Sequence, residues 1–565
     1  MEQKINSVSQ SVGVPIPNNT DHAVSVTLPT WASVVGYEEG DQNVVLKMQT
    51  GYPRFFIHNS IQKLTDYLIQ EYGRVGLEGL FIFPSYTVSQ RCKKFMIQRI
   101  QKLESPTDKG YKKVRIVKLT TSAPKCENEM NYRVQMAIGL VFFPKQYSKY
   151  GKEFWQHSGE GISSRLAEYL LHEFEYEKLT KHRESSTENL EDEDKKFVEE
   201  KFGRNLKFIE ADNANVIIRK RIITEVQQNN KADATVKVGD ESDVFLYPSG
   251  MSSIYNVHNI WLETLPNHKT VVFGFPYVDT LNITKKFGPG LIHLGNGSNE
   301  ELDWLDEQLS SGKEKILGLI TECPGNPLLR TPNLKKLRAI ADKHSFPVAI
   351  DETVGNCINI NAYKYADATC SSLTKIFSGD SNVMGGSIVL NQNSKFYSTM
   401  KAWLNEHYEN NFWKEDCLYL ERNSRDFLQR NAKTNKNTEE VVKLFEKYQE
   451  KGAVKQIFHP LTSPSKKYYD EVKNPNGGYG GLLSILFSTT QISKKFYDVL
   501  KLSKGPSLGT NFTLVCPYTI LAHYTELEEV KEFGVDADLV RISIGIEPTR
   551  ELVDIIEEAI LEAVN

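Results

Sequence analysis

The stretch from about residue 244 to residue 395 most constrains the fold, because short apolar runs alternate there with helical segments. The runs are VVFGF (271–275), ILGLITE (316–322), FPVAIDE (346–352) and GGSIVLN (385–391). Each run is short and largely apolar, as is typical of a strand that is buried on both faces. Their alternation with helices predicts an α/β architecture, in which helices cover both sides of a mostly parallel sheet.

Two helices of this stretch are marked by their own sequence. Ser298 and Glu301 have the spacing of a capping box, in which each side chain bonds the backbone of the other residue. Pro332 lies near the start of a second helix, where a missing N–H costs nothing. The apolar residues that share one face of this second helix are Leu334, Leu337, Ile340 and Ala341.

The chain is long enough for several domains, and the pattern changes twice along it. Residues 1–205 predict an N-terminal extension of mixed α/β structure, with an acidic linker near 184–202. Residues 206–395 contain the strand–helix alternation and form the large domain. Residues 396–565 combine long polar helices with the strand-like run VRISIG (540–545), which predicts a smaller C-terminal α+β domain.

Composition excludes several classes of protein. The net charge of −4 argues against a nucleic-acid binder, which normally carries a basic surplus. The seven cysteines include no CxxC pair, which argues against a zinc site or a disulfide framework. The first residues lack the apolar core of a signal peptide, and no run reaches the roughly eighteen apolar residues of a membrane span. We therefore expect a cytoplasmic protein.

Three features suggest one kind of ligand site. Ligands of α/β sheets lie beyond the carboxyl ends of the strands, and Asp351 ends one apolar run while Lys375 follows a polar segment. Alone, Asp351 reads as a turn residue and Lys375 as a surface lysine. Ser249 and Gly250 open a helical pattern after VFLYP, so backbone amides are available there for a phosphate. Pyridoxal phosphate (PLP) requires a lysine, an acid for its ring nitrogen and a phosphate site together.

The residues around these positions resemble the Cys/Met-metabolism branch of PLP enzymes. The matching motifs are SGMSSI (249–254), YVDT (277–280), ECPGNPLL (322–329), DET (351–353), SSLTK (371–375), PSLGT (506–510) and VRISIGIE (540–547). They occur in the family's order over about residues 200–550. The resemblance implies the PLP-dependent transferase fold type I, which is aspartate-aminotransferase-like, with a mostly parallel seven-stranded sheet and a smaller C-terminal domain.

The resemblance also implies a role for each matching residue. Lys375 would hold the cofactor and move protons, Asp351 would keep the pyridine nitrogen protonated, and Tyr277 would stack on the ring and act as an acid or base. The remaining matches are phosphate contacts from Gly250, Met251, Ser372 and Thr374, a ring-oxygen contact from Asn326, and substrate-carboxylate contacts from Ser507 and Arg541.

A family motif Y-x-R, which serves the phosphate of a neighbouring subunit, has two counterparts here. Arg204 in FGRN has the expected place before SGM but follows Phe202 rather than a tyrosine. Arg54 in GYPR has Tyr52 beside it but lies about 200 residues before SGM. We prefer Arg204. Other departures from the family pattern put substrate choice in doubt more than cofactor use, and they are Ser371, Val278, Asp279 and Pro506.

The N-terminal third, with runs such as TGYPRFFIH and FWQHSGEGISSRLAEYLL, resembles fungal-type cystathionine γ-synthase-like proteins. The implied reaction replaces the acyloxy group of an O-acylhomoserine by cysteine and gives cystathionine. Three alternatives stay open: an O-acylhomoserine sulfhydrylase that uses sulfide, a cystathionine lyase, and a regulatory protein with a PLP fold. The resemblance further implies a homodimer or homotetramer with shared active sites.

Overall fold

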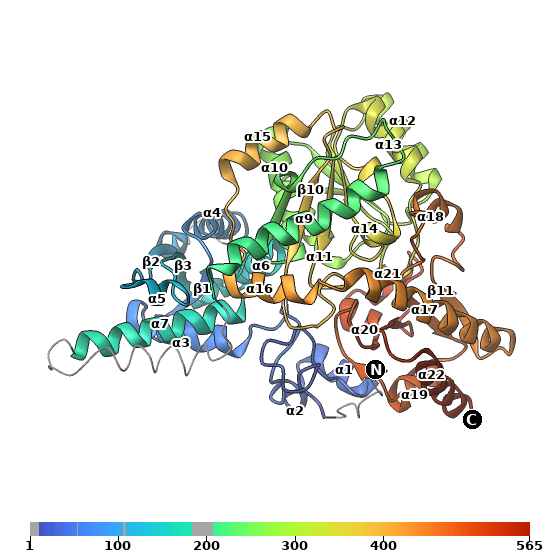
Figure 1. Cartoon of the computed structure of the whole chain (residues 1–565), viewed down its shortest axis with the longest axis horizontal. Coiled ribbons are helices and arrows are strands. Elements are labelled where there is room, and N and C mark those ends of the chain that lie inside the picture. Colours follow the sequence, from blue (N-terminus) through green and yellow to red (C-terminus); the bar gives the residue numbers. More distant parts are fainter. Residues whose placement is uncertain (1–10, 54, 105–108, 184–206) are drawn as a thin grey trace.

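The computed structural model describes residues 11–53, 55–104, 109–183 and 207–565. Three separate sheets organise this part of the chain, with three, seven and five strands. In Figure 1 the three-stranded sheet lies to the left, the seven-stranded sheet lies in the upper centre, and the C-terminal elements lie at the lower right. The first described helices, α1 (Trp31–Glu39) and α2 (Gln42–Val45), lie beside the C-terminal elements.

The seven-stranded sheet confirms the predicted α/β core. Its order is β4-β10-β9-β8-β7-β5-β6. The strands are β4 (Val244–Tyr247), β5 (Lys269–Phe273), β6 (Leu291–Leu294), β7 (Ile316–Glu322), β8 (Val348–Asp351), β9 (Ala368–Ser372) and β10 (Gly386–Leu390). Strand β10 runs antiparallel to both of its neighbours. The expectation that GGSIVLN forms a parallel strand is therefore wrong, because an apolar run reports burial and not direction.

Helices cover both faces of this sheet. Helix α10 packs on β9 and β10 within one apolar cluster, while α12 and α13 pack against β5, β7 and β8 within another. The capping box of Ser298 and Glu301 is present at the start of α12. The helices of this region are α9 (Glu210–Asn230), α10 (Gly250–Thr264), α11 (Val278–Lys286), α12 (Asn299–Ser310), α13 (Leu334–His344), α14 (Asn356–Asn359), α15 (Tyr397–His407) and α16 (Lys414–Asn423).

The three-stranded sheet has the order β1-β3-β2 and is antiparallel. Its side chains alternate between two apolar clusters, because successive strand residues point to opposite faces. Phe81 and Phe143 join α4 and α6 on one face, and Leu80 and Phe142 join α3 and α7 on the other. The elements are β1 (Glu78–Phe83), β2 (Arg115–Thr120), β3 (Ala137–Pro144), α3 (Asn59–Tyr72), α4 (Tyr86–Leu103), α5 (Glu127–Met130), α6 (Ser148–Ser158) and α7 (Ser164–Arg183).

The five-stranded sheet has the order β11-β12-β15-β14-β13. Its strands are β11 (Val454–Phe458), β12 (Leu482–Phe487), β13 (Ser503–Lys504), β14 (Leu514–Pro517) and β15 (Val540–Ser543). Its helices are α17 (Phe427–Glu450), α18 (Lys466–Val472), α19 (Thr490–Val499), α20 (Tyr518–His523), α21 (Leu527–Lys531) and α22 (Thr549–Val564). Trp31 and Val34 of α1 belong to the same apolar cluster as this sheet. The N-terminal arm, residues 11–53, thus packs against the last part of the chain.

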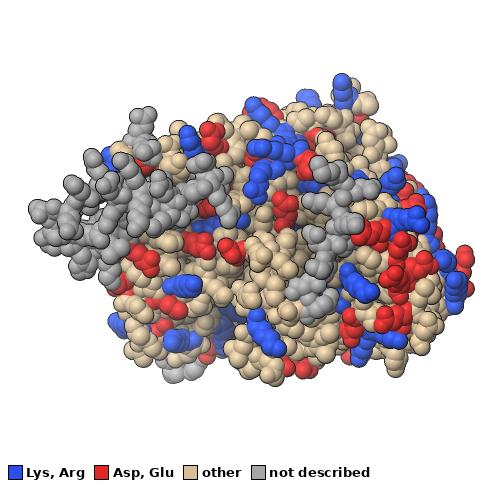
Figure 2. All heavy atoms as spheres, turned by 60° about the horizontal axis from the view of Figure 1, so that its bottom comes forward, with Lys and Arg blue, Asp and Glu red and all other residues tan. Residues whose placement is uncertain are grey.

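Basic and acidic side chains both appear across the face drawn in Figure 2. Within the described residues, no helix combines the length and the apolar character that a membrane crossing requires. The division of the chain at residues 205 and 395 stays a prediction.

Candidate active site

A cavity opens where the carboxyl ends of β7, β8 and β9 meet the start of α10. Parallel pairing places Glu322 at the end of β7 directly beside Asp351 at the end of β8. The cavity is also lined by residues of the C-terminal sheet and of the N-terminal arm, among them Ser507, Arg541 and Tyr52. Segments from three distant parts of the sequence therefore meet at one site, at the edge of the sheet where α/β proteins bind ligands.

The start of α10 lies against the end of β9. Ser249 is the N-cap of α10, and its side chain accepts a hydrogen bond from the Ser252 backbone N–H. A Cβ atom on Gly250 would lie 2.5 Å from the Cβ of Ser372, so only glycine allows this approach. The first amides of an α-helix have no intrahelical partner and carry the positive end of the helix dipole. This corner can hold a phosphate between backbone amides and the Ser372 hydroxyl.

The two carboxyl groups at the strand ends lie in an apolar environment. Burial raises the pKa of Asp351, which accepts hydrogen bonds from the Thr353 N–H at 2.9 Å and the Thr353 hydroxyl at 2.6 Å. Burial and the neighbouring Asp351 raise the pKa of Glu322 to about 8. Glu322 accepts a hydrogen bond of 2.6 Å from the Tyr277 N–H. A cationic group entering between these carboxyls would bring them back toward the ionised form.

Lys375 is a buried amine inside the cavity, with 7% of its surface exposed. Its Nζ donates hydrogen bonds to the Ser507 hydroxyl at 2.7 Å and to the Tyr52 hydroxyl at 3.0 Å. The Nζ atom also lies 4.5 Å from the centre of the Tyr52 ring. Ser507 has a φ of 91°, a conformation that non-glycine residues rarely adopt. Such backbone strain concentrates at functional sites.

Arg541 is held on the wall that faces the sheet ends. It comes from β15, it is 5% exposed, and it donates to the Asn326 side chain at 3.1 Å and to the Ser507 carbonyl at 2.6 Å. Its guanidinium lies 4.6 Å from the centre of the Tyr518 ring. Asn326 in turn donates to the Tyr518 hydroxyl at 3.2 Å. These contacts fix the guanidinium plane, and a fixed guanidinium is suited to bind a carboxylate through two parallel bonds.

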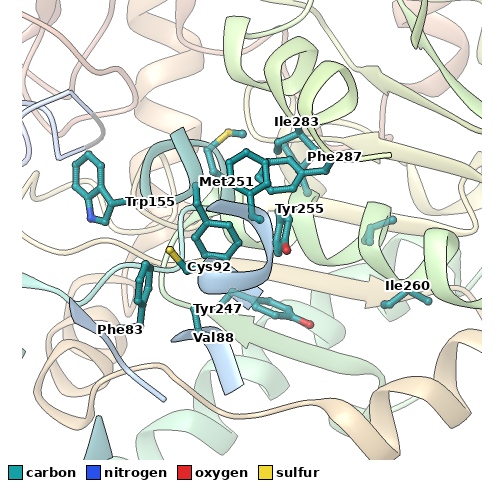
Figure 3. Packing of buried hydrophobic residues seen from close by; sticks show 14 of the residues in the cluster. Phe83, Val88, Cys92, Trp155, Tyr247, Met251, Tyr255, Ile260, Ile283 and Phe287 are labelled. Atoms are coloured by element: carbon teal, nitrogen blue, oxygen red, sulfur yellow. The ribbon is translucent and has the colours of Figure 1, made fainter. Parts of the chain in front are cut away.

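Met251 and Thr374 also line the cavity. The Met251 side chain lies among buried residues such as Tyr255 of α10, Ile283 of α11 and Phe287, which directly follows α11 (Figure 3). The Thr374 hydroxyl accepts a hydrogen bond of 3.1 Å from the Gly385 N–H. Tyr277 directly precedes α11 and lines the cavity.

The cavity brings together every described residue that the sequence singled out. These are Gly250, Met251, Tyr277, Asn326, Asp351, Ser372, Thr374, Lys375, Ser507 and Arg541. Arg204 and Arg54 both lie outside the described residues, so the choice between them stays a prediction. The roles of the individual side chains also stay predictions.

Several lining residues were not predicted. Tyr518 begins α20 directly after β14, and Thr353 follows Asp351, so both could have been found as polar residues that end strands. Tyr52 belongs to the GYPR motif, and no sequence motif includes Glu38. Neither has a local signal, because each reaches the site from the N-terminal arm.

The residues present fit PLP. The buried amine of Lys375, the buried carboxyl of Asp351 and the tight corner at Gly250 match the aldehyde, the ring nitrogen and the phosphate of this cofactor. The charge of the buried carboxyl pair, Glu322 and Asp351, also favours PLP as the ligand. Within the described residues, Asp351 accepts hydrogen bonds from Thr353 and forms no ion pair, and a pyridinium N–H would supply a positive charge beside it.

Comparison with known proteins agrees with this geometry. The model of the Cys/Met metabolism PLP-dependent enzyme family matches residues 225–561, and that of the fungal trans-sulfuration enzyme N-terminal domain matches residues 60–163. The cystathionine gamma-synthase of Saccharomyces cerevisiae is 39% identical, over 99% of this chain and 100% of the relative. The cystathionine gamma-synthase of Neurospora crassa is 37% identical, over 97% and 98%.

A solved structure shows the same fold. The cystathionine gamma synthase of Xanthomonas oryzae pv. oryzae, in complex with aminoacrylate and cysteine, aligns with a TM-score of 0.52 and 20% identity. The alignment covers 61% of this chain and 86% of that one. This likeness confirms the predicted fold class, and the family match confirms PLP as the cofactor. The chain belongs to the Cys/Met metabolism PLP-dependent enzyme family.

Proposed function

We propose that the protein is a cystathionine γ-synthase, which joins an O-acylhomoserine and cysteine. The observation that carries this proposal is the similarity to fungal relatives of that name, which extends over nearly the whole of both chains. The cavity supports it, because an amine, an acid and a carboxylate-binding arginine converge there. A small amino-acid substrate fits such a site.

PLP, when bound, draws electrons away from the α-carbon of an amino acid and so makes its protons easier to remove. Lys375 would hold the cofactor and then carry protons to and from the substrate carbons as a general base. Its Nζ lies in the cavity between the Ser507 and Tyr52 hydroxyls, a position that favours this role because the amine can reach a small substrate bound there. Asp351 would keep a proton on the ring nitrogen.

The proposed phosphate contacts lie where the start of α10 meets the end of β9. Backbone amides of Gly250 and Met251, with the hydroxyls of Ser372 and Thr374, would hold the phosphate. Either Arg204 or Arg54 would complete this phosphate site. Tyr277 would stack on the ring and act as an acid or base, and a contact from Asn326 would reach the ring oxygen.

Arg541 and Ser507 would bind the α-carboxylate of the O-acylhomoserine. Arg541 is preorganised by Asn326 and Tyr518, so little side-chain entropy is lost on binding. In the overall reaction the Cγ–O bond of the acylhomoserine breaks and a Cγ–S bond to cysteine forms. The acyloxy group leaves as a carboxylate, and the proton of the thiol is released.

We also propose a cytoplasmic homodimer or homotetramer. The expectation of shared active sites rests on an arginine that would reach a neighbour's phosphate. Tyr52, in contrast, reaches Lys375 of its own chain.

Product analysis tests the proposal. The purified enzyme is offered O-acetylhomoserine or O-succinylhomoserine, with either cysteine or sulfide. We expect cystathionine from cysteine, and we expect the Lys375→Ala variant to form none. Homocysteine from sulfide, without cystathionine from cysteine, would favour a sulfhydrylase, and cystathionine breakdown without synthesis would favour a lyase. Failure of the wild type to bind PLP would favour a regulatory protein.

A further inference from the structure

The N-terminal arm brings one acidic side chain to the cavity. Helix α1 ends at Glu39, and Glu38 in its last turn lines the same cavity as Lys375 and Arg541. The helix itself gives no reason for an acid there, because the dipole disfavours a negative charge near the C-terminus of a helix. The explanation for Glu38 therefore lies in the cavity.

Contacts at both ends of α1 fix the direction of Glu38. At the start, the Trp31 N–H donates to Asp498 at 2.7 Å. At the end, the Tyr524 hydroxyl donates to Glu39 at 2.5 Å. Successive helix residues point in directions about 100° apart. Glu39 is thus exposed and bound to Tyr524, whereas its neighbour Glu38 is half-buried and lines the cavity.

Glu38 has no positive partner among the residues that the structure describes. Burial is the cause that raises its pKa to about 7, and no hydrogen bond or ion pair to it occurs within the described part of the chain. The other two acids of the cavity, Glu322 and Asp351, accept hydrogen bonds from backbone amides at the strand ends. A carboxyl removed from water is stabilised by a cation that donates a hydrogen bond to it. With Asp351 assigned to the cofactor, Glu38 is the lining acid that has no hydrogen bond within the described residues and can bind a second ligand group.

We propose that Glu38 binds the α-ammonium group of the second substrate, the amino-acid thiol. This inference rests on the proposed function, in which Arg541 binds the carboxylate of the first substrate. The α-ammonium group of a thiol amino acid can donate a hydrogen bond to the Glu38 carboxylate, whereas sulfide has no ammonium group. A charge-assisted bond of this kind makes Glu38 a determinant of which thiol is used.

The test compares two thiols that differ in the amino group. Cysteine and 3-mercaptopropionate share the thiol and the carboxylate, and only cysteine has the ammonium. With O-acetylhomoserine and the PLP-bound enzyme, we expect Glu38→Gln to lower kcat/KM for cysteine about tenfold to a hundredfold, mainly through KM. The value for 3-mercaptopropionate should change less than about twofold, and KM for O-acetylhomoserine should stay the same.

Glu39→Gln is the matched control, because it removes a neighbouring acid that binds Tyr524 outside the cavity. We expect it to leave the preference for cysteine unchanged. Glu38→Asp keeps the charge and should keep most of the preference, which guards against a Glu38→Gln variant that folds poorly.

Two results would overturn the inference. One is an equal loss for both thiols in Glu38→Gln, and the other is an unchanged kcat/KM for cysteine. If the wild type forms no cystathionine at all, the proposed function fails first, and the inference falls with it. That outcome is distinguishable, because it concerns the wild type and not the variants.

Discussion

At the scale of single residues, the site depends on acids that are kept out of water. Glu322 and Asp351 lie side by side because parallel strands β7 and β8 end together. Their burial disfavours the charged form of both groups, and each makes ionisation of the other harder. A cofactor with a protonated ring nitrogen relieves this repulsion. The binding of PLP and the charge of the carboxyl pair should therefore be coupled.

The coupling predicts how the stability of the cofactor-free protein depends on pH. Because the pKa of Glu322 is raised to about 8, its protonated form stabilises the fold below the unfolded-state pKa, and this stability is lost as pH rises through about 8. Relative to Glu322→Gln, the wild type should lose on the order of 4 kcal/mol of unfolding free energy between pH 5 and pH 8.5, since each pKa unit corresponds to about 1.4 kcal/mol. Urea denaturation across this range measures the difference.

The control for this experiment is Glu529→Gln, which changes an exposed glutamate on α21. Its difference from the wild type should stay constant with pH. A constant difference for Glu322→Gln as well would contradict the raised pKa.

At the scale of elements, the phosphate corner depends on the packing of α10 against β9. Gly250→Ala places a methyl group 2.5 Å from the Cβ of Ser372, so one of the two elements must shift. We expect a loss of about 1–3 kcal/mol of unfolding free energy, as is typical of overpacking. PLP affinity should fall as well, because the amides and the Ser372 hydroxyl separate. Thermal unfolding and PLP titration measure the two effects.

A change elsewhere on α10 separates this packing effect from general damage to the helix. Asn259 lies farther along α10 and donates to Glu263 on the same helix. Asn259→Ala should leave PLP affinity unchanged. Equal PLP affinity for Gly250→Ala and the wild type would show that the corner does not hold the phosphate.

The local sequence predicts some of the strands and misses others. ILGLITE matches β7 because it is an unbroken apolar run with an acid at its end. Strands β6 and β9 were not predicted, since LIHL is very short and ATCSS is largely polar. The antiparallel direction of β10 was also missed, because direction depends on the connection between strands and not on composition.

At the scale of the whole molecule, the N-terminal arm completes the site. The arm is tied to the C-terminal elements by buried contacts: the Tyr497 hydroxyl donates to the Leu28 carbonyl at 2.6 Å, and Lys504 donates to the Pro29 carbonyl at 2.9 Å. The arm carries Glu38 and Tyr52 to a cavity that is built mostly by residues from Ser249 onward. No local pattern could have predicted such contacts, whereas residues of the family motifs at the sheet ends line the same cavity, and their roles stay predictions.

Subunit mixing tests whether Tyr52 and Lys375 of the same chain lie in one site. Tyr52 and Lys375 contact each other within a single chain, so each of the variants Tyr52→Ala and Lys375→Ala damages its own site. When both variants are co-expressed and purified as mixed oligomers, we expect no activity beyond the sum of the two. Activity clearly above that sum would mean that the arm serves a neighbouring chain.

The most direct test of the central claim is to identify the lysine that binds PLP. Borohydride makes the link between a lysine and the cofactor permanent, and mass spectrometry of a digest then locates it. We predict a pyridoxyl group on the peptide that contains Lys375, and no labelled peptide in Lys375→Ala. Lys504 is also buried, and its pKa is lowered to about 8 by burial, so it is the strongest competitor. A label on Lys504, or no label at all, would contradict this account.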